Sequence, residues 1–178
     1  MNDLKNREDI PLLLPNDCVG CELGVFLCEF SDVLLSSNKF SKLYLVDTFS
    51  GVVGSGDKRG DNIKNYNGQD LLTHANNKYI NNAIVSVIQQ DSFSFLRSFG
   101  PQTFDFIYID TVHTYPHLTM ELEEAHKVIK KNGLICGHDY NANVFPGVVK
   151  AVHNFCEKYS LSFKLTTEDH LESFVIQL

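Results

Sequence analysis

Residues 104–110 read FDFIYID, and residues 133–140, about one helix further along the chain, read GLICGHDY. Each stretch is a short apolar run that leads to an acidic residue. A parallel strand buried on both faces has this pattern, and it carries the acid to the edge of an open α/β sheet, where ligands bind. Two more runs of this kind, 42–47 and 85–91, end in Asp47 and Asp91. The repetition predicts a mostly parallel sheet.

Strands and helices alternate along the rest of the chain. Beside those runs, the pattern predicts a strand at 18–23 and helices at 29–36, 70–79, 92–99, 118–131 and 146–159. The β-rich runs 161–167 and 173–178 are only five residues apart, which forces an antiparallel hairpin. The expected fold is therefore α/β, with a single Rossmann-like seven-stranded sheet, mostly parallel, helices on both faces and an antiparallel C-terminal hairpin.

Composition favours one domain over residues 1–178, because 178 residues with 43% hydrophobic side chains can bury one core. Residues 1–16 form a short lead-in, and the glycine-rich residues 50–68 form a flexible loop that could cover a ligand. The net charge of -7 disfavours nucleic acid as a partner. No apolar run approaches the roughly 20 residues of a membrane span, and residues 1–8 lack the apolar middle of a signal peptide. We expect a cytoplasmic protein.

Five cysteines, an odd number scattered at 18, 21, 28, 136 and 156, do not resemble a disulfide framework. Cys18 and Cys21 form a C-x-x-C on a predicted strand, where an offset of three sends the side chains to opposite faces. We expect all five to be buried as small hydrophobic residues.

The turn after the first strand contains Glu22-x-Gly24. A glycine there lets the backbone approach a ligand closely, and the following helix favours anionic groups. The turn lacks the G-x-G-x-x-G spacing of dinucleotide-binding folds, which counts against nicotinamide and flavin cofactors.

These residues, taken together, resemble the class I S-adenosylmethionine-dependent methyltransferases, and more narrowly a small bacterial group with the pattern I-D-G-D-H-S-Y followed by G-H-D-Y. The resemblance covers residues 18–156 and is carried by Glu22, Gly24, Asp47, Asp91, Ser92, segment 109–115 and segment 137–140. Cys28 stands where the family commonly has glycine, and Thr111-Val112 replace Gly-Asp.

The resemblance implies a role for each matched residue. Glu22 and Gly24 would line the methionine and ribose side of S-adenosylmethionine, and Asp47 would accept hydrogen bonds from the ribose hydroxyls. Around the adenine it implies contacts from Thr48, Phe49, Asp91 and Ser92, with Asp91 on the amino group and Ser92 on a ring nitrogen. Asp110 would face the methionine end. For Asp47 and Asp91, capping of a helix N-terminus is the structural alternative.

Two histidines are the candidate general bases, His113 and His138, because imidazole titrates near neutral pH. Asp110 and Asp139 resemble by position the carboxylate pair that binds Mg²⁺ in metal-dependent O-methyltransferases. A histidine beside them would suit a softer transition metal better. His113 and His117, four residues apart, could also chelate on a helix face, although the sequence offers no third ligand nearby.

The sequence thus predicts an S-adenosylmethionine-dependent methyltransferase acting on an oxygen of a small polar molecule, such as a sugar or a metabolite. A divalent cation such as Mg²⁺ is a candidate second cofactor, and a homodimer is a candidate assembly. Two alternatives stay open. One is a non-catalytic relative that binds the cofactor and acts as an interaction module, and the other is an NAD-dependent oxidoreductase.

Overall fold

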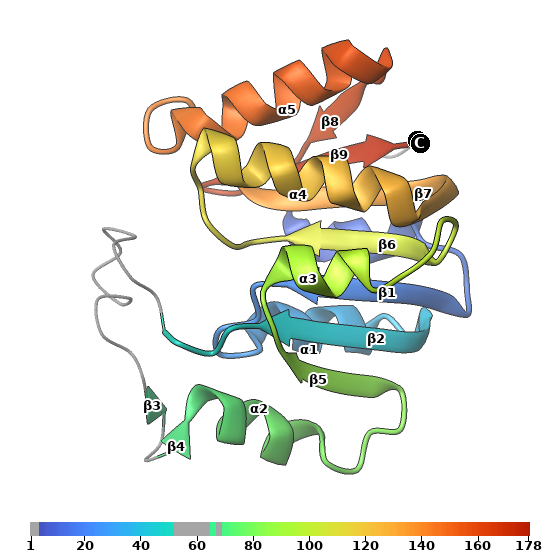
Figure 1. The fold of residues 1–178 in the computed structure, drawn as a ribbon, viewed down its shortest axis with the longest axis vertical. Coiled ribbons are helices and arrows are strands. Elements are labelled where there is room, and N and C mark those ends of the chain that lie inside the picture. The colour runs from blue at the N-terminus through green and yellow to red at the C-terminus, as the bar shows by residue number, and fades with distance from the viewer. Residues whose placement is uncertain (1–3, 52–64, 67–68) are drawn as a thin grey trace.

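The computed structural model describes residues 4–51, 65–66 and 69–178, and most of these residues surround one seven-stranded sheet (Figure 1). The strand order is β5-β2-β1-β6-β7-β9-β8. Its strands are β1 (Cys18–Leu23), β2 (Phe40–Asp47), β5 (Val85–Gln89), β6 (Phe104–Ile109), β7 (Ile129–Tyr140), β8 (Phe163–Leu165) and β9 (Glu172–Gln177). A separate two-stranded ladder pairs β3 (Asn65–Tyr66) with β4 (Gln69–Asp70).

Five neighbouring strands, from β5 to β7, run parallel, so their carboxyl ends meet at one edge of the sheet. Strand β9 pairs antiparallel with β7, and β8 pairs antiparallel with β9. The predicted seven-stranded Rossmann-like sheet, with its C-terminal hairpin at one side, is confirmed. The edge formed by the carboxyl ends is where the acids of the sequence pattern come together.

Helices cover both faces of the sheet (Figure 1). One face carries α3 (Ser92–Arg97), α4 (Tyr115–Val128) and α5 (Pro146–Tyr159), whose apolar residues form one core cluster. The other carries a 3-10 helix, η1 (Arg7–Leu13), with α1 (Glu29–Ser36) and α2 (Leu71–Tyr79), which form the second cluster. All the described helices are too short or too polar to cross a bilayer.

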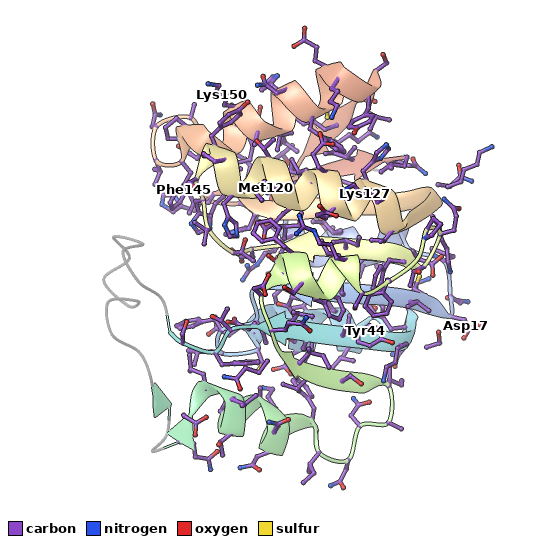
Figure 2. The ribbon with its side chains drawn as sticks, viewed as in Figure 1. Asp17, Tyr44, Met120, Lys127, Phe145 and Lys150 are labelled. Atoms are coloured by element: carbon purple, nitrogen blue, oxygen red, sulfur yellow. The ribbon has the colours of Figure 1, made fainter. Side chains whose placement is uncertain are left out.

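Side chains alternate between the two cores along each strand. Cys21 belongs to the cluster under α3 and α4, whereas Cys18 belongs to the cluster under α1, so the sheet separates the two thiols. All five cysteines are free and buried, as expected. Tyr44 of β2 lies beside α3, where its ring packs 5.5 Å from those of Phe95 and Phe99 (Figure 2).

The predicted end of the long helix was wrong: α4 ends at Val128 rather than at Lys131, and β7 begins at Ile129. The loop before β6 forms hydrogen bonds with the backbone where α4 ends and β7 begins. Thr103 N–H donates to the Val128 carbonyl at 2.8 Å, and the Gln102 amide donates to the Ile129 carbonyl at 3.1 Å. These long-range hydrogen bonds favour extended backbone where local periodicity favours helix. Most of the predicted 50–68 loop, residues 52–64 and 67–68, lies outside the described residues.

Candidate active site

A cavity of about 470 Å³ lies at the carboxyl ends of β1, β2, β5 and β6. Six of the eight predicted cofactor residues line it, namely Gly24, Asp47, Thr48, Asp91, Ser92 and Asp110. The other two are not among the residues that line it. Glu22 is 2% exposed, and Phe49 packs into the core on the α1 side of the sheet. His113 and Phe145 complete one side of the cavity, with their rings 4.4 Å apart.

Gly24, directly after β1, lies against the backbone of Asp110, directly after β6. Its φ is +89°, and a Cβ placed on it would lie 1.9 Å from the backbone oxygen of Asp110. The two strand ends are joined there because Asp110 N–H donates to the Leu23 carbonyl at 2.8 Å. Any side chain at this position would separate the strands, so the predicted need for glycine has a direct steric cause.

Asp47 fixes the backbone around that glycine. One carboxylate oxygen accepts from the backbone N–H groups of Val25 and Phe26 at 2.8 and 3.0 Å, and the other accepts from Phe49 N–H at 2.8 Å. The capping alternative is wrong for this residue, because the N-caps of α1 and α2, the described helices before and after it in the sequence, are Cys28 and Asp70. A carboxylate has about four lone-pair sites, so ribose hydroxyls could still bind it.

Asp91 does cap a helix. Its side chain accepts from Ser94 N–H at 2.9 Å at the start of α3, and this hydrogen bond holds the pKa of Asp91 below its usual value. The carboxylate also lines the cavity. Capping and ligand contact are therefore compatible here.

Glu22, in contrast, is removed from water. Burial raises the pKa of its carboxyl group to about 8, although the Ser31 hydroxyl donates to it at 2.5 Å. Burial therefore favours the protonated form of this side chain, and we do not expect it to act as an anion toward a ligand.

Glu121 of α4 is a site residue that the motifs did not reveal. It is fully buried and accepts from the hydroxyls of Ser92 at 2.5 Å and Thr111 at 2.7 Å, and His117 Nε2 lies 3.3 Å away. All three partners line the cavity. The carboxylate also raises the pKa of His117. An acid on the apolar face of the helix, three residues after the buried Leu118, is the sequence signal that could have identified it.

This contact changes the expectation for Ser92. A hydroxyl has one proton, and the Ser92 hydroxyl gives it to Glu121, so toward the cavity its oxygen can only accept. Its backbone N–H, in the first turn of α3, is the group of Ser92 that could donate to a ring nitrogen.

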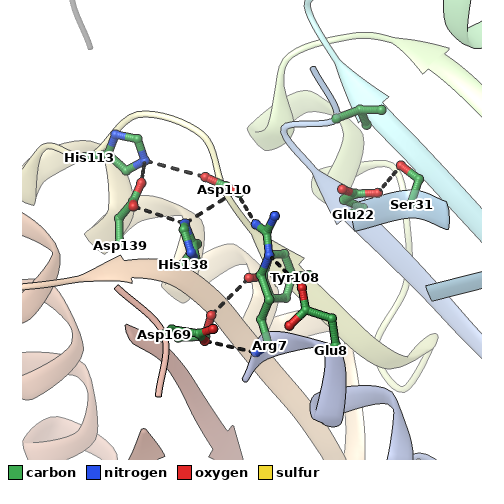
Figure 3. Close-up of polar contacts among 12 residues, drawn as sticks. Arg7, Glu8, Glu22, Ser31, Tyr108, Asp110, His113, His138, Asp139 and Asp169 are labelled. Carbon is green, nitrogen blue, oxygen red and sulfur yellow. Dashed lines mark hydrogen bonds and ion pairs between the residues drawn. The ribbon is translucent and has the colours of Figure 1, made fainter. Parts of the chain in front are cut away.

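The four predicted catalytic and metal-binding residues form one cluster between the ends of β6 and β7 (Figure 3). His113 Nε2 lies 2.5 Å from Asp139 Oδ2 and 3.6 Å from Asp110 Oδ1. His138 Nδ1 lies 3.0 Å from Asp139 Oδ1 and 3.9 Å from Asp110 Oδ2. Asp139 is thus held between the two imidazoles, and two members of the cluster, Asp110 and His113, line the cavity.

Backbone geometry turns Asp139 toward the histidines. Its φ is +61°, and the pairing of β7 with β9 becomes irregular between Gly137 and Tyr140. Aspartate is among the few residues that tolerate this conformation. Non-glycine residues held there are often part of functional sites.

Charge pairing sets the protonation of the cluster. Burial lowers the pKa of His113, but Asp110 and Asp139 outweigh burial and raise it to about 9. The same competition leaves the pKa of His138 raised. Burial raises the pKa of Asp139, but the two histidines outweigh burial and hold that pKa well below its usual range. His113 is therefore an imidazolium at neutral pH.

Three members of the cluster are also spaced to share a cation. Ligand atoms of Asp110, His113 and Asp139 all lie within 4.8 Å of one another. Two carboxylates with one imidazole fit a transition metal better than Mg²⁺, which prefers oxygen ligands. The sequence predicted the two acids, and the structure adds His113, rather than His138, as their partner.

Comparison with known proteins places the chain among enzymes of one kind. A sequence model described as a methyltransferase domain matches residues 18–140. Among curated proteins, none matches the sequence significantly.

Several solved structures share the fold. The N-methyltransferase NodS from Bradyrhizobium japonicum superposes with a TM-score of 0.63 at 13% identity, covering 96% of this chain and 93% of NodS. Aeropyrum pernix fibrillarin, solved with natively bound S-adenosyl-L-methionine, superposes with a TM-score of 0.59 at 10% identity. The match covers 91% of this chain and 67% of fibrillarin. Spermidine synthase from Thermotoga maritima superposes with a TM-score of 0.64 at 13% identity. The match covers 97% of this chain, which spans only 56% of the length of the synthase. At such identities the likeness is one of fold.

Proposed function

Because the chain belongs to the methyltransferase domain family, we propose that it transfers the methyl group of S-adenosylmethionine to an oxygen atom of a small polar molecule. The observation that carries the choice of oxygen is the pair of histidines anchored on Asp139 and Asp110, of which His113 lines the cavity and His138 does not. A hydroxyl acceptor must lose its proton during methyl transfer, and a histidine paired with a carboxylate can accept that proton.

The cavity suits a nucleoside cofactor in size and lining. Its volume of about 470 Å³ lies within the usual range for small-molecule sites. We place the ribose near Asp47, the adenine near Asp91 and the Ser92 backbone, and the methionine end near Asp110. When bound, the cofactor supplies an electrophilic methyl group on a sulfonium.

The chain's own residues then orient the acceptor and remove its proton. His113 lines the cavity and is the first candidate base; because its pKa is raised to about 9, it takes up this role in the neutral fraction, which grows as the pH rises toward that value. His138 is the second, since its bond to Asp139 uses Nδ1 and leaves Nε2. Asp139 stabilises whichever imidazole becomes charged. Phe145, packed on His113, would keep water from that side of the acceptor.

A divalent cation fits the same cluster. Asp110, His113 and Asp139 would hold it, and it would lower the pKa of an acceptor hydroxyl. We treat the cation as a second candidate for the source of acceptor deprotonation. The net charge of -7 supports a small acceptor rather than a nucleic acid, and a homodimer remains a proposal for the assembly.

The test is methyl transfer from labelled S-adenosylmethionine to a panel of hydroxylated metabolites, with and without chelator. We expect His113→Gln or His138→Gln to lower turnover strongly while cofactor affinity stays within about threefold. His170→Gln, at an exposed position, is the matched control. Loss of turnover with chelator, restored by Mn²⁺ or Mg²⁺, would favour the cation. Transfer to nitrogen alone, or normal turnover in both histidine variants, would contradict the proposal.

A further inference from the structure

One side of the cavity is left for the methyl acceptor once the cofactor contacts are placed. It is lined by segment 111–114 and by Phe145. Within it, the Thr111 hydroxyl donates to Glu121 at 2.7 Å, so that proton is not available to a ligand. The side chains left to face an acceptor are those of Val112, His113, Thr114 and Phe145.

Val112 is an apolar residue of the cavity wall, and 48% of it is exposed. Single exposed apolar residues are common on protein surfaces and need no explanation. This one directly precedes the candidate base His113 and lines the same cavity. It also stands where the sequence pattern that this chain resembles has an acid. A ligand that covered Val112 would remove apolar surface from water, which favours binding.

Phe145 provides the second apolar surface, and its position is fixed by the protein. Its ring lies 4.4 Å from the imidazole of His113, and its backbone N–H donates to the Asn141 carbonyl at 2.8 Å. The start of α5 packs directly on the segment that contains His113, because a Cβ on Gly147 would lie 2.8 Å from the His113 carbonyl oxygen. This apolar surface is thus formed before a ligand binds, which lowers the entropic cost of binding.

The polar groups beside these two residues are largely committed to the protein. The side-chain oxygen of Asn141 accepts from the backbone N–H groups of Asn143 and Val144 at 3.0 and 3.1 Å. Of the four side chains that face the acceptor, Thr114 alone carries a hydroxyl. Apart from His113, this wall therefore offers few side-chain partners for further hydroxyl groups on an acceptor.

Resting on the proposed function, which brings the acceptor hydroxyl to His113, we propose that the acceptor carries this hydroxyl on an apolar body that packs against Val112 and Phe145. Such a molecule is polar at its reacting end and apolar beside it. A sugar placed there would lose water from several hydroxyls that find no partner on the two apolar side chains, which costs free energy. Val112 and Phe145 are thereby residues that determine acceptor specificity.

Two probes with the same six-carbon ring test the inference, cyclohexanol and myo-inositol, because both present secondary hydroxyls and differ in the polarity of the ring. Each is titrated into the protein saturated with S-adenosylhomocysteine. The NMR signal of the His113 imidazole, identified by its absence in His113→Gln, reports binding beside the candidate base. We expect cyclohexanol to bind at least about tenfold more tightly than myo-inositol.

Substitutions of the two apolar residues should reduce this preference. Val112→Thr keeps the branched shape and adds a hydroxyl, and it should lower the preference for cyclohexanol by about threefold or more. Phe145→Ser should lower it further, and thermal unfolding shows whether that variant stays folded; if it does not, Val112→Thr decides alone. Ile80→Thr is the matched control, because Ile80 is 75% exposed and does not line the cavity. It should leave the preference unchanged.

The failure of this inference is distinguishable from the failure of the proposed function. If S-adenosylhomocysteine binds but myo-inositol binds as tightly as cyclohexanol, or neither probe moves the His113 signal, the inference is overturned and the proposed function stands. An unchanged preference in Val112→Thr also overturns it. If S-adenosylhomocysteine does not bind, the proposed function fails and the inference fails with it.

Discussion

Replacing His113 with glutamine should change how the stability of the protein depends on pH. The pKa of His113 is raised from 6.5 to about 9 in the folded protein by Asp110 and Asp139, against the effect of burial. A group whose pKa is higher in the folded state stabilises that state fully below its unfolded pKa. That contribution is lost as the pH rises through the folded pKa.

The magnitude follows from the shift. Each pKa unit corresponds to about 1.4 kcal/mol, so His113 contributes on the order of 3 kcal/mol below pH 6.5, which falls to nearly zero above pH 9. Asp139 stays ionised across this window because its pKa is lowered, so it adds no slope. His138 is present in both proteins, and its effect cancels to first order.

Urea unfolding in the presence of a chelator, at several pH values from 6.5 to beyond 9, gives the free energy of unfolding for each protein. The difference in free energy of unfolding between the unaltered protein and His113→Gln should decrease by about 3 kcal/mol from the lowest to the highest pH. His170→Gln, the exposed control, should run parallel to the unaltered protein. Parallel curves for His113→Gln would refute the assigned charge pairing.

Three further substitutions test the shape of the site. Gly24→Ala should cost about 3 kcal/mol or more in urea unfolding, because its Cβ would meet the Asp110 backbone at 1.9 Å and its φ is +89°; an unchanged midpoint would contradict this. Cys28→Gly should stay within about 1 kcal/mol of the original stability, because the backbone there has a φ of +66°, which glycine adopts without strain. Cys28→Val should lose more than about 2 kcal/mol, because a β-branched side chain fits this backbone poorly. Equal losses in the two variants would contradict this reasoning. Glu121→Gln should lower the pKa of His117, followed by NMR titration, and an unmoved titration would remove Glu121 as its partner.

Much of the fold could be predicted because its signals are local. Strand β1 and helix α1 have the predicted bounds, since an apolar run ends at Gly24 and a new amphipathic stripe begins at Glu29. The meeting of Asp110 with Asp139 was also predictable, because adjacent parallel strands end at the same edge. The sequence could not show which imidazole contacts which carboxylate.

The features that were missed depend on contacts between distant residues. The early start of β7 follows from hydrogen bonds made by Gln102 and Thr103. Glu121 looked like one more charge on a helix, and only the packing of α4 on α3 turns it toward Ser92. Arg7 lies before the first matched residue, and its position 3.9 Å from Asp110 depends on the docking of η1.

Calorimetric titration of the purified protein with S-adenosylhomocysteine and, separately, with NAD tests the central claim most directly. We expect one S-adenosylhomocysteine per chain with micromolar-range affinity, about -8 kcal/mol, and no measurable heat from NAD. Binding of NAD in place of S-adenosylhomocysteine, or binding of neither, would contradict the assignment of this cavity to a methyl-donor cofactor.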